Sequence, residues 1–182
     1  MKHTLNRPIP LLHPTLISLV GTMYKNSPNF TTIADIAVAG LNPPLIMISI
    51  HQNHACMDNI NTTHTFSVNI PTNDLIKEVD FAGIYSGKTK DKSNLFEVEY
   101  IDQIPVLKSA PIQLIVKEEQ RVQIEHRVIL VCRVLKTILD TKLIETGKLD
   151  LSNIKTVLYG LDNKYYSVGD ITGIAYHEGY KL

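Results

Sequence analysis

The feature that most constrains the fold is a period-two pattern in the second half of the chain. From Val122 to Val134 the even positions are apolar apart from His126, and the odd positions are polar as far as Arg127. Such alternation is typical of a β-strand that buries one face, so we expect a strand here with His126 in the core. Ile129 and Val131 make the second face apolar too. We therefore expect that face to be covered by a partner subunit or by a helix of the same chain.

The remaining apolar segments are short and are separated by turn-forming residues. Pro43 and Pro44 together end any regular element. The spacing of apolar residues predicts a helix over Asn73–Ile84, with Thr72 or Asn73 as its N-cap, and Ala55–Asn61 is expected to form a shorter helix. Strands are predicted over Leu16–Met23, Leu45–Ile50, Phe66–Ile70 and Val98–Ile101. Six or more short strands with a few helices favour a mainly β fold, a barrel, over an alternating βαβ array.

Composition and charge exclude several classes of protein. The 182 residues fit one domain over positions 1–182, and 18 basic against 18 acidic residues give a formal net charge of zero. This balance argues against nucleic acid and against an anionic membrane as partners, and the apolar runs are too short to span a bilayer. Cys56 and Cys132 are far apart and follow no secretion signal, which indicates a reduced, cytoplasmic protein.

The stretch SPNFTTIAD, Ser27 to Asp35, is rich in small hydrogen-bonding side chains. A plain β-turn needs only two special residues, so we interpret this stretch as a long irregular loop. Irregular backbone leaves N–H and C=O groups unpaired, and these groups face either water or a polar ligand. The stretch is therefore either a surface loop or a cradle for a ligand. No GxGxxG or GxxxxGKS/T pattern occurs, so these phosphate-binding fingerprints are not supported.

Five motifs follow one another along the chain. They are a strand that ends in Gly-Thr before PNFTTIAD, then LNPPLIMISI, FSVNIP, VDFAGIYSGKTKDK and the tail YYSVGDITGIAYHEGYKL. In this order they resemble the flavin reductase-like, FMN-binding split-barrel family, in its flavoredoxin-type branch. The resemblance implies an FMN-binding split β-barrel, mainly β with a few helices and dimeric, with FMN at the dimer interface. That arrangement agrees with the apolar strand at Ile129–Val131.

The resemblance also implies which residues bind FMN. Beside the ring and the ribityl chain we expect Asn29, Phe30, Thr31, Thr32, Ile33, Ala34, Ser49, Ile50 and His51. The start of the short helix favours an anion and would offer its amides to the phosphate. Near the phosphate we expect Cys56, Asn59 and Ile60 on one helix face, together with Ser86, Gly87, Lys88 and Lys92. The alternatives are ordinary strand ends and a solvated lysine loop.

Two features of this region bear on its chemistry. Relatives often place a threonine near position 56, and the thiol of Cys56 is a weaker donor, which leaves the role of this position open. His51 and His54 form an HxxH pair, but without a third ligand nearby they make a poor zinc site, so no metal is expected.

The resemblance implies a flavin-dependent oxidoreductase with no catalytic acid, base or nucleophile of its own. Electrons would pass from NADH or NADPH through FMN to a flavin, a ferric complex or a small electron-carrier protein. The pattern favours neither nicotinamide. The alternative is an FMN-binding electron-transfer protein without its own nicotinamide-dependent activity. A third interpretation is a structural split barrel that has lost flavin.

Overall fold

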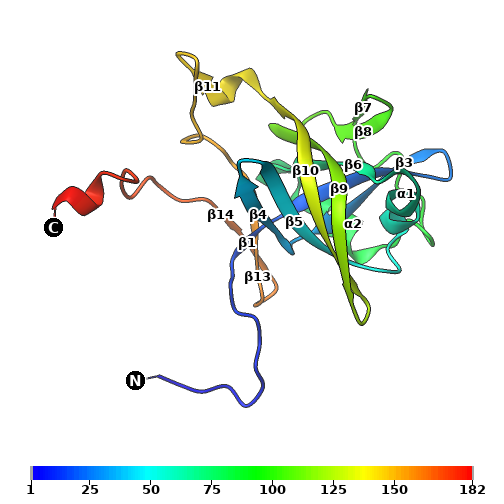
Figure 1. Ribbon diagram of the computed structural model, residues 1–182, viewed down its shortest axis with the longest axis horizontal. Helices are drawn as coiled ribbons and strands as arrows, with labels where there is room; N and C mark the ends of the chain where they lie inside the picture. Colours follow the sequence, from blue (N-terminus) through cyan, green and yellow to red (C-terminus); the bar gives the residue numbers. More distant parts are fainter. Residues whose placement is uncertain (1, 182) are drawn as a thin grey trace.

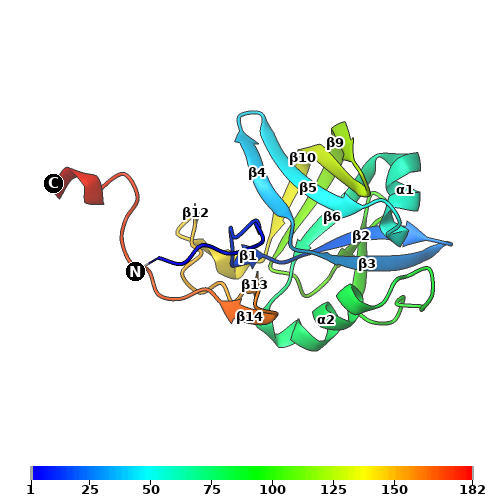
Figure 2. The ribbon, with the colours of Figure 1, turned by 90° about the horizontal axis from the view of Figure 1, so that it is seen from below.

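The computed structural model describes residues 2–181 and is mainly β, with two α-helices among these residues (Figures 1 and 2). A seven-stranded antiparallel sheet in the order β3-β2-β6-β9-β10-β5-β4 forms a split-barrel-like body. Its strands are β2 (Ser18–Tyr24), β3 (Ser27–Ile33), β4 (Ile36–Leu41), β5 (Pro44–His51), β6 (Thr65–Ile70), β9 (Ile112–Ile124) and β10 (Arg127–Leu139). The helices are α1 (Ala55–Thr63) and α2 (Ile76–Ile84).

Shorter elements complete the described chain. One small sheet contains β1 (Thr15–Leu16), β13 (Val157–Gly160) and β14 (Lys164–Ser167). Two hairpins pair β7 (Val98–Ile101) with β8 (Ile104–Leu107) and β11 (Ile144–Glu145) with β12 (Lys148–Leu149). The short 3-10 turns are η1 (Asn73–Leu75), η2 (Thr141–Leu143) and η3 (Glu178–Lys181). The two predicted helices are confirmed, as are the strands predicted over Leu16–Met23, Leu45–Ile50, Phe66–Ile70 and Val98–Ile101. Thr72 is the N-cap of η1 but makes no side-chain cap bond.

The stretch SPNFTTIAD is mostly a strand, so the prediction of a long irregular loop was wrong. β3 pairs with β2 across the two-residue turn Lys25-Asn26, whose φ angles of 48° and 65° are those of a type I′ hairpin. Phenylalanine, threonine and isoleucine favour extended backbone, which outweighs the turn-forming residues at the start of the stretch. β3 is an edge strand of the sheet. Hydrogen-bonding groups on its outer side are therefore free to meet other parts of the chain.

The period-two segment is a hairpin rather than a single strand. β9 and β10 turn at Glu125-His126, which pairs Ile124 with Arg127 and Val122 with Ile129. A two-residue turn keeps the alternation in the sequence but switches the even positions to the opposite face of the sheet. The prediction of a buried His126 was therefore wrong, and His126 lies exposed in the turn.

Two hydrophobic clusters lie on the two faces of the sheet. The interior of the barrel holds Val20, Ile48 and Phe66, with Met57 and Ile60 of α1 packed against them. The outer cluster contains Leu19 and Phe30 of the β2–β3 hairpin, covered by α2, and the Phe30 ring packs edge-on against Phe96 at 5.4 Å. Because β2 contributes alternate residues to both clusters, each helix is held against its own side of the same hairpin.

The FSVNIP motif has a structural role inside this packing. The Ser67 hydroxyl donates to the Pro105 carbonyl at 2.5 Å, and the Asn69 amide donates to the Leu19 carbonyl at 3.0 Å. Asn69 Oδ1 accepts the Leu107 main-chain N–H at 2.9 Å. Both polar residues are fully buried. They satisfy main-chain groups of β8 and β2 that the sheet leaves unpaired.

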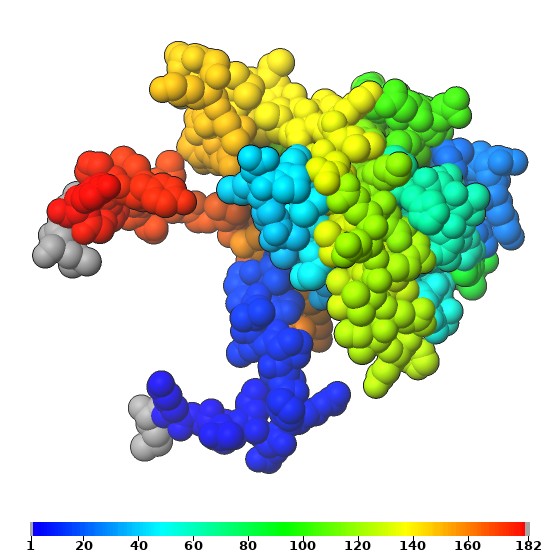
Figure 3. All heavy atoms as spheres, viewed as in Figure 1, coloured from blue at the N-terminus to red at the C-terminus, as the bar shows by residue number. Residues whose placement is uncertain are grey.

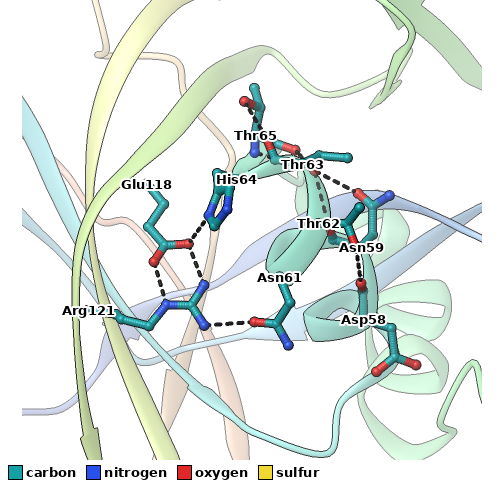
Figure 4. Close-up of polar contacts among 9 residues, drawn as sticks. All are labelled: Asp58, Asn59, Asn61, Thr62, Thr63, His64, Thr65, Glu118 and Arg121. Atoms are coloured by element: carbon teal, nitrogen blue, oxygen red, sulfur yellow. Dashed lines mark hydrogen bonds and ion pairs between the residues drawn. The ribbon is translucent and has the colours of Figure 1, made fainter.

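The C-terminal end of α1 is held to β9 by a polar network (Figure 4). His64 ends the helix in a left-handed conformation, and its ring contacts the Glu118 carboxylate at 3.1 Å. Arg121 binds the same carboxylate with two nitrogens and donates to Asn61 Oδ1 at 2.7 Å. The Arg121 hydrogen bonds lower the pKa of Glu118; burial opposes this shift, and the His64 contact adds to it.

The two ends of the described chain extend away from the barrel as arms (Figures 1 and 3). We call residues 2–14 the N-terminal arm and residues 168–181 the C-terminal arm. Leu12 is 85% exposed and Tyr176 is 98% exposed, and Leu41 on the neighbouring strand β4 is 86% exposed. In the part of the chain that the structure describes, both α-helices have nine residues, and neither has the length and hydropathy of a membrane-spanning helix.

Candidate functional site

A cavity of about 120 Å³ lies where β3, the start of α1 and the segment after α2 meet. We call it the β3–α1 pocket. Thr31, Ser86, Gly87 and Lys92 are the residues predicted from the sequence that line it. His54 and the last turn of α2 complete the wall. The pocket therefore brings together residues of the PNFTTIAD and VDFAGIYSGKTKDK motifs and the start of α1.

Lys92 is the buried cation of the pocket. Its side chain is only 5% exposed, and its ammonium group donates to the carbonyls of Phe30 at 2.7 Å and Ala82 at 3.2 Å. These bonds fix the open edge of β3 to the end of α2. Among the ion pairs of residues 2–181, none includes Lys92. Burial lowers the pKa of this ammonium group, and a bound anion would compensate its charge.

The start of α1 faces the same space. His54 is the N-cap residue in an extended conformation, and its side chain makes no cap bond. The first amides of a helix have no carbonyl partner within the helix, so this end carries positive partial charge. Ala55 lines the pocket directly. The helix start and the Lys92 ammonium group thus favour the same kind of ligand, a compact anion.

Gly87 lies in close contact with the Asn29 side chain beside the pocket. A Cβ atom at position 87 would lie 2.2 Å from Asn29 Oδ1 and 3.2 Å from the Ala55 Cβ, so only glycine brings the loop backbone this close. Asn29 is 4% exposed, and its Oδ1 has no hydrogen-bond partner among the described residues. An unpaired buried oxygen beside a helix start and a buried cation fits a flavin nucleotide, because the oxygen can accept from ribityl hydroxyls and the cation can bind the phosphate.

Several predicted residues have side chains that lie in the core. Phe30, Ile33, Ile50, Cys56 and Ile60 are all at least 95% buried. Their side chains pack in the two hydrophobic clusters, so they can meet a ligand only through the main chain. Burial raises the pKa of the Cys56 thiol to about 11, which keeps it neutral and unreactive.

Lys88 and Asn59 do not line the β3–α1 pocket. The Lys88 ammonium group pairs with Asp58 of α1 at 3.0 Å, so this cation holds the loop to the helix. Asn59 lines a different cavity of about 420 Å³ near the other end of α1. The prediction that Cys56, Asn59 and Ile60 share one ligand-facing side of α1 was wrong. Cys56 and Ile60 face the core, whereas Asn59 faces this second cavity.

The remaining predicted residues do not line the β3–α1 pocket; they are Thr32, Ala34, Ser49 and His51. The Thr32 hydroxyl donates to the Val79 carbonyl at 2.6 Å, and the Ser49 amide donates to the Asp35 carbonyl at 2.8 Å, next to Ala34. The His51 ring stacks between the rings of His54 and His126, with centroids 5.9 Å from each. Within residues 2–181 no group of three histidine, cysteine or acidic side chains is placed to hold a metal ion.

His54 and the last turn of α2 are the site residues that the sequence analysis missed. His54 was weighed only as half of a metal pair, although it directly precedes the predicted helix. Histidine is not among the residue types that signal an N-cap, so the sequence carried no cap signal at this position. Nothing in the sequence pattern placed Ala82 or Gly83 beside β3, because their approach depends on how α2 packs against the sheet.

The fold and the pocket define a small antiparallel β-barrel protein with a small cavity that contains a buried lysine. The family model described as "Flavin reductase like domain" matches residues 11–167. The chain therefore belongs to the flavin reductase-like family, in its flavoredoxin-type branch. This membership identifies it as a flavin-binding redox protein.

Solved structures share the fold. Flavoredoxin from Methanosarcina acetivorans is 26% identical with a TM-score of 0.92, and the match covers 100% of this chain and 98% of that one. Flavoredoxin of Desulfovibrio vulgaris is 24% identical with a TM-score of 0.88 and coverage of 98% and 100%. The FMN-binding protein from Thermus thermophilus is 18% identical, with a TM-score of 0.81 and coverage of 96% and 99%. None of the curated proteins compared with the chain matches it.

Proposed function

We propose that the protein is an FMN-dependent oxidoreductase that takes electrons from NADH or NADPH and passes them to a flavin, a ferric complex or a small redox protein. The observation that carries this proposal is the β3–α1 pocket, where a buried lysine without an acidic partner lies beside the start of α1. The flavin reductase-like family supports the redox assignment. When bound, the flavin supplies the hydride and electron chemistry.

The residues of the chain bind and orient the cofactor rather than act as acid or base. Lys92, the first amides of α1 and the Ser86 hydroxyl would hold the phosphate. The main chain of Gly87 would lie close to it because no side chain intervenes. The strand ends at Thr32–Ala34 and Ser49–His51 would border the ring and the ribityl chain. The pocket itself is only about 120 Å³, which suits a phosphate group and leaves the ring outside it.

We propose that a second copy of the chain covers the flavin ring. Both arms and the outer face of β4 carry large apolar side chains that no other part of the described chain covers. Exposed apolar surface of this extent indicates an interaction site. Ile129 and Val131 are half-buried, which leaves part of the second face of β10 open as well. We therefore propose a homodimer; sedimentation velocity would measure its mass, and a monomer at every concentration would contradict it.

The decisive experiment combines absorbance and reduction kinetics. The purified protein, supplied with FMN, is expected to show flavin bands and to bleach within seconds when mixed anaerobically with NADH or NADPH. A protein that remains colourless with excess FMN would contradict any flavin function. Replacing Lys77, which is exposed on α2, by methionine serves as a control that should alter neither result.

An electron carrier is the second candidate, and its support is the close match to two flavoredoxins. In that case FMN binds, but NADH and NADPH do not reduce it on a catalytic timescale. Chemical reduction with dithionite followed by mixing with an oxidised acceptor would then still transfer electrons. The two candidates thus differ in one measured rate, that of reduction by the nicotinamide. A cytoplasmic location is part of both proposals.

A further inference from the structure

His54 occupies an unusual position in the β3–α1 pocket. It lines the cavity, and its Nδ1 atom is buried without a hydrogen-bond partner among the described residues. A buried ring nitrogen without a partner carries a free-energy cost, which a ligand can remove. The main chain around it is fixed, because the His54 amide donates to the His51 carbonyl at 3.0 Å and the His54 carbonyl accepts the Met57 amide at 3.0 Å. The backbone of His54 is therefore held in place, and its ring is incompletely bonded.

The titratable groups that face His54 from neighbouring elements are all basic. They are His51 on β5, Arg127 on β10, and Lys88 and Lys92 on the loop after α2. Burial first, and then these groups, lower the pKa of His54, so the ring is neutral near pH 7. A neutral ring beside Lys92 leaves the pocket with one fixed positive charge.

Two of the four neighbours already have acidic partners. Arg127 pairs with Asp35 at 3.1 Å, and Lys88 pairs with Asp58 at 3.0 Å. Of the lysine and arginine side chains in this group, Lys92 alone has no acidic partner among the described residues. A phosphate monoester carries close to two negative charges above a pH of about 6. Protonation of His54 would raise the positive charge of the pocket to two and match that dianion.

We propose that His54 binds the flavin phosphate as an imidazolium, so that each FMN bound near pH 7.5 brings one proton into the site. This inference rests on the proposed function, because it assumes that the FMN phosphate enters the β3–α1 pocket. The proton comes from the buffer, the imidazole nitrogen receives it, and no covalent bond changes. His54 is thereby a phosphate-binding residue, and flavin affinity is coupled to pH.

Titration calorimetry tests the proposal directly. FMN is titrated into the protein at pH 7.5 in Tris and in PIPES, whose ionisation enthalpies differ, and the slope of the binding enthalpy gives the number of protons taken up. We expect about one proton for FMN and none for riboflavin, which lacks the phosphate. Uptake of one proton also predicts that FMN affinity falls roughly tenfold per pH unit between pH 7 and 8.

Three variants separate His54 from the other titratable groups. His54→Gln should bind FMN more weakly and without proton uptake, and riboflavin binding with an unchanged circular dichroism spectrum would show that it is folded. His54→Arg carries a fixed charge and should bind FMN tightly, again without proton uptake. His126→Gln, in the same ring stack but outside the pocket, should keep the full uptake.

The outcomes distinguish this inference from the proposed function. FMN binding without proton uptake in the native protein would overturn the role of His54 alone. Undiminished proton uptake in His54→Gln would also overturn it and assign the proton to another group. Failure of FMN to bind at all would overturn both proposals.

Discussion

The ammonium group of Lys92 lies 2.7 Å from the main-chain carbonyl oxygen of Phe30, across 62 positions of sequence. This hydrogen bond closes the open edge of β3 and brings the loop after α2 to the strand. It also buries a positive charge next to the start of α1. One residue therefore fixes the wall of the β3–α1 pocket and supplies its charge.

Replacing Lys92 by methionine should weaken FMN binding and destabilise the fold. Loss of a charge-assisted bond to the phosphate is expected to lower affinity by roughly tenfold to a hundredfold. The carbonyls of Phe30 and Ala82 lose their donor, which costs about 1 to 2 kcal/mol in the free energy of unfolding. Fluorescence titration and urea unfolding measure the two effects. Lys77→Met is the control, and equal behaviour of the two variants would remove Lys92 from the site.

Gly87→Ala should lower FMN affinity, because its methyl group would lie 2.2 Å from Asn29 Oδ1 unless the loop moves. Gly169→Ala is a matched control, since nothing lies within 4 Å of the atom it adds. We expect the first variant to lose at least tenfold in FMN affinity by fluorescence titration and the second to keep it. Unchanged binding by Gly87→Ala would show that the phosphate does not need the close backbone approach at this position.

Asn69→Leu should destabilise the protein by about 2 to 4 kcal/mol. It leaves the Leu107 N–H and the Leu19 carbonyl buried and unpaired. The exposed Asn94 provides the control substitution Asn94→Leu, for which urea unfolding should show a change within about 0.5 kcal/mol. A small effect of Asn69→Leu would mean that the FSVNIP motif does not stabilise the fold through these bonds.

The network around Glu118 should make stability depend on acid pH. The Arg121 hydrogen bonds hold the pKa of Glu118 below its usual value of 4.5, so its contribution to folding is complete above about 4.5 and is lost as pH falls through the lowered pKa. Glu118→Gln should therefore cost about 1 to 2 kcal/mol at pH 7, and the difference from the native protein should shrink below pH 4.5.

The adjacent Glu119 is the control for this prediction. Glu119 pairs with Arg133 at the surface, and such exposed pairs contribute little to stability. Urea unfolding of Glu119→Gln is expected to match the native protein within about 0.5 kcal/mol at both pH values. A Glu118→Gln deficit that persists undiminished at low pH would point to packing instead of charge.

Most of the fold could be predicted from local patterns, and its two errors have one cause. Strands and helices that follow their own periodicity were found, such as Leu45–Ile50 and Asn73–Ile84. The turns Lys25-Asn26 and Glu125-His126 were missed, because neither contains glycine or proline and a two-residue turn does not interrupt an alternating pattern. Because these turns were missed, β3 was predicted to be a loop, and the facing ends of β9 and β10 were predicted to be one strand.

The motifs indicated which segments of the chain form the pocket, but they did not indicate which side chains of those segments line it. Lys88 and Lys92 occur in one polar loop and are equivalent in composition, yet one pairs with Asp58 and the other is buried against Phe30. That difference depends on contacts with residues 30 and 62 positions away, respectively. Periodicity carries no information about such contacts, which is why His54 was missed as well.

The arms that leave the barrel have a consequence for how the protein keeps its cofactor. If their apolar side chains are buried only when two molecules meet, retention of FMN becomes a property of the population of molecules and follows mass action. Dilution would then release flavin from a protein whose pocket is chemically intact, and abundance in the cell would set how much of it is in the yellow, working form.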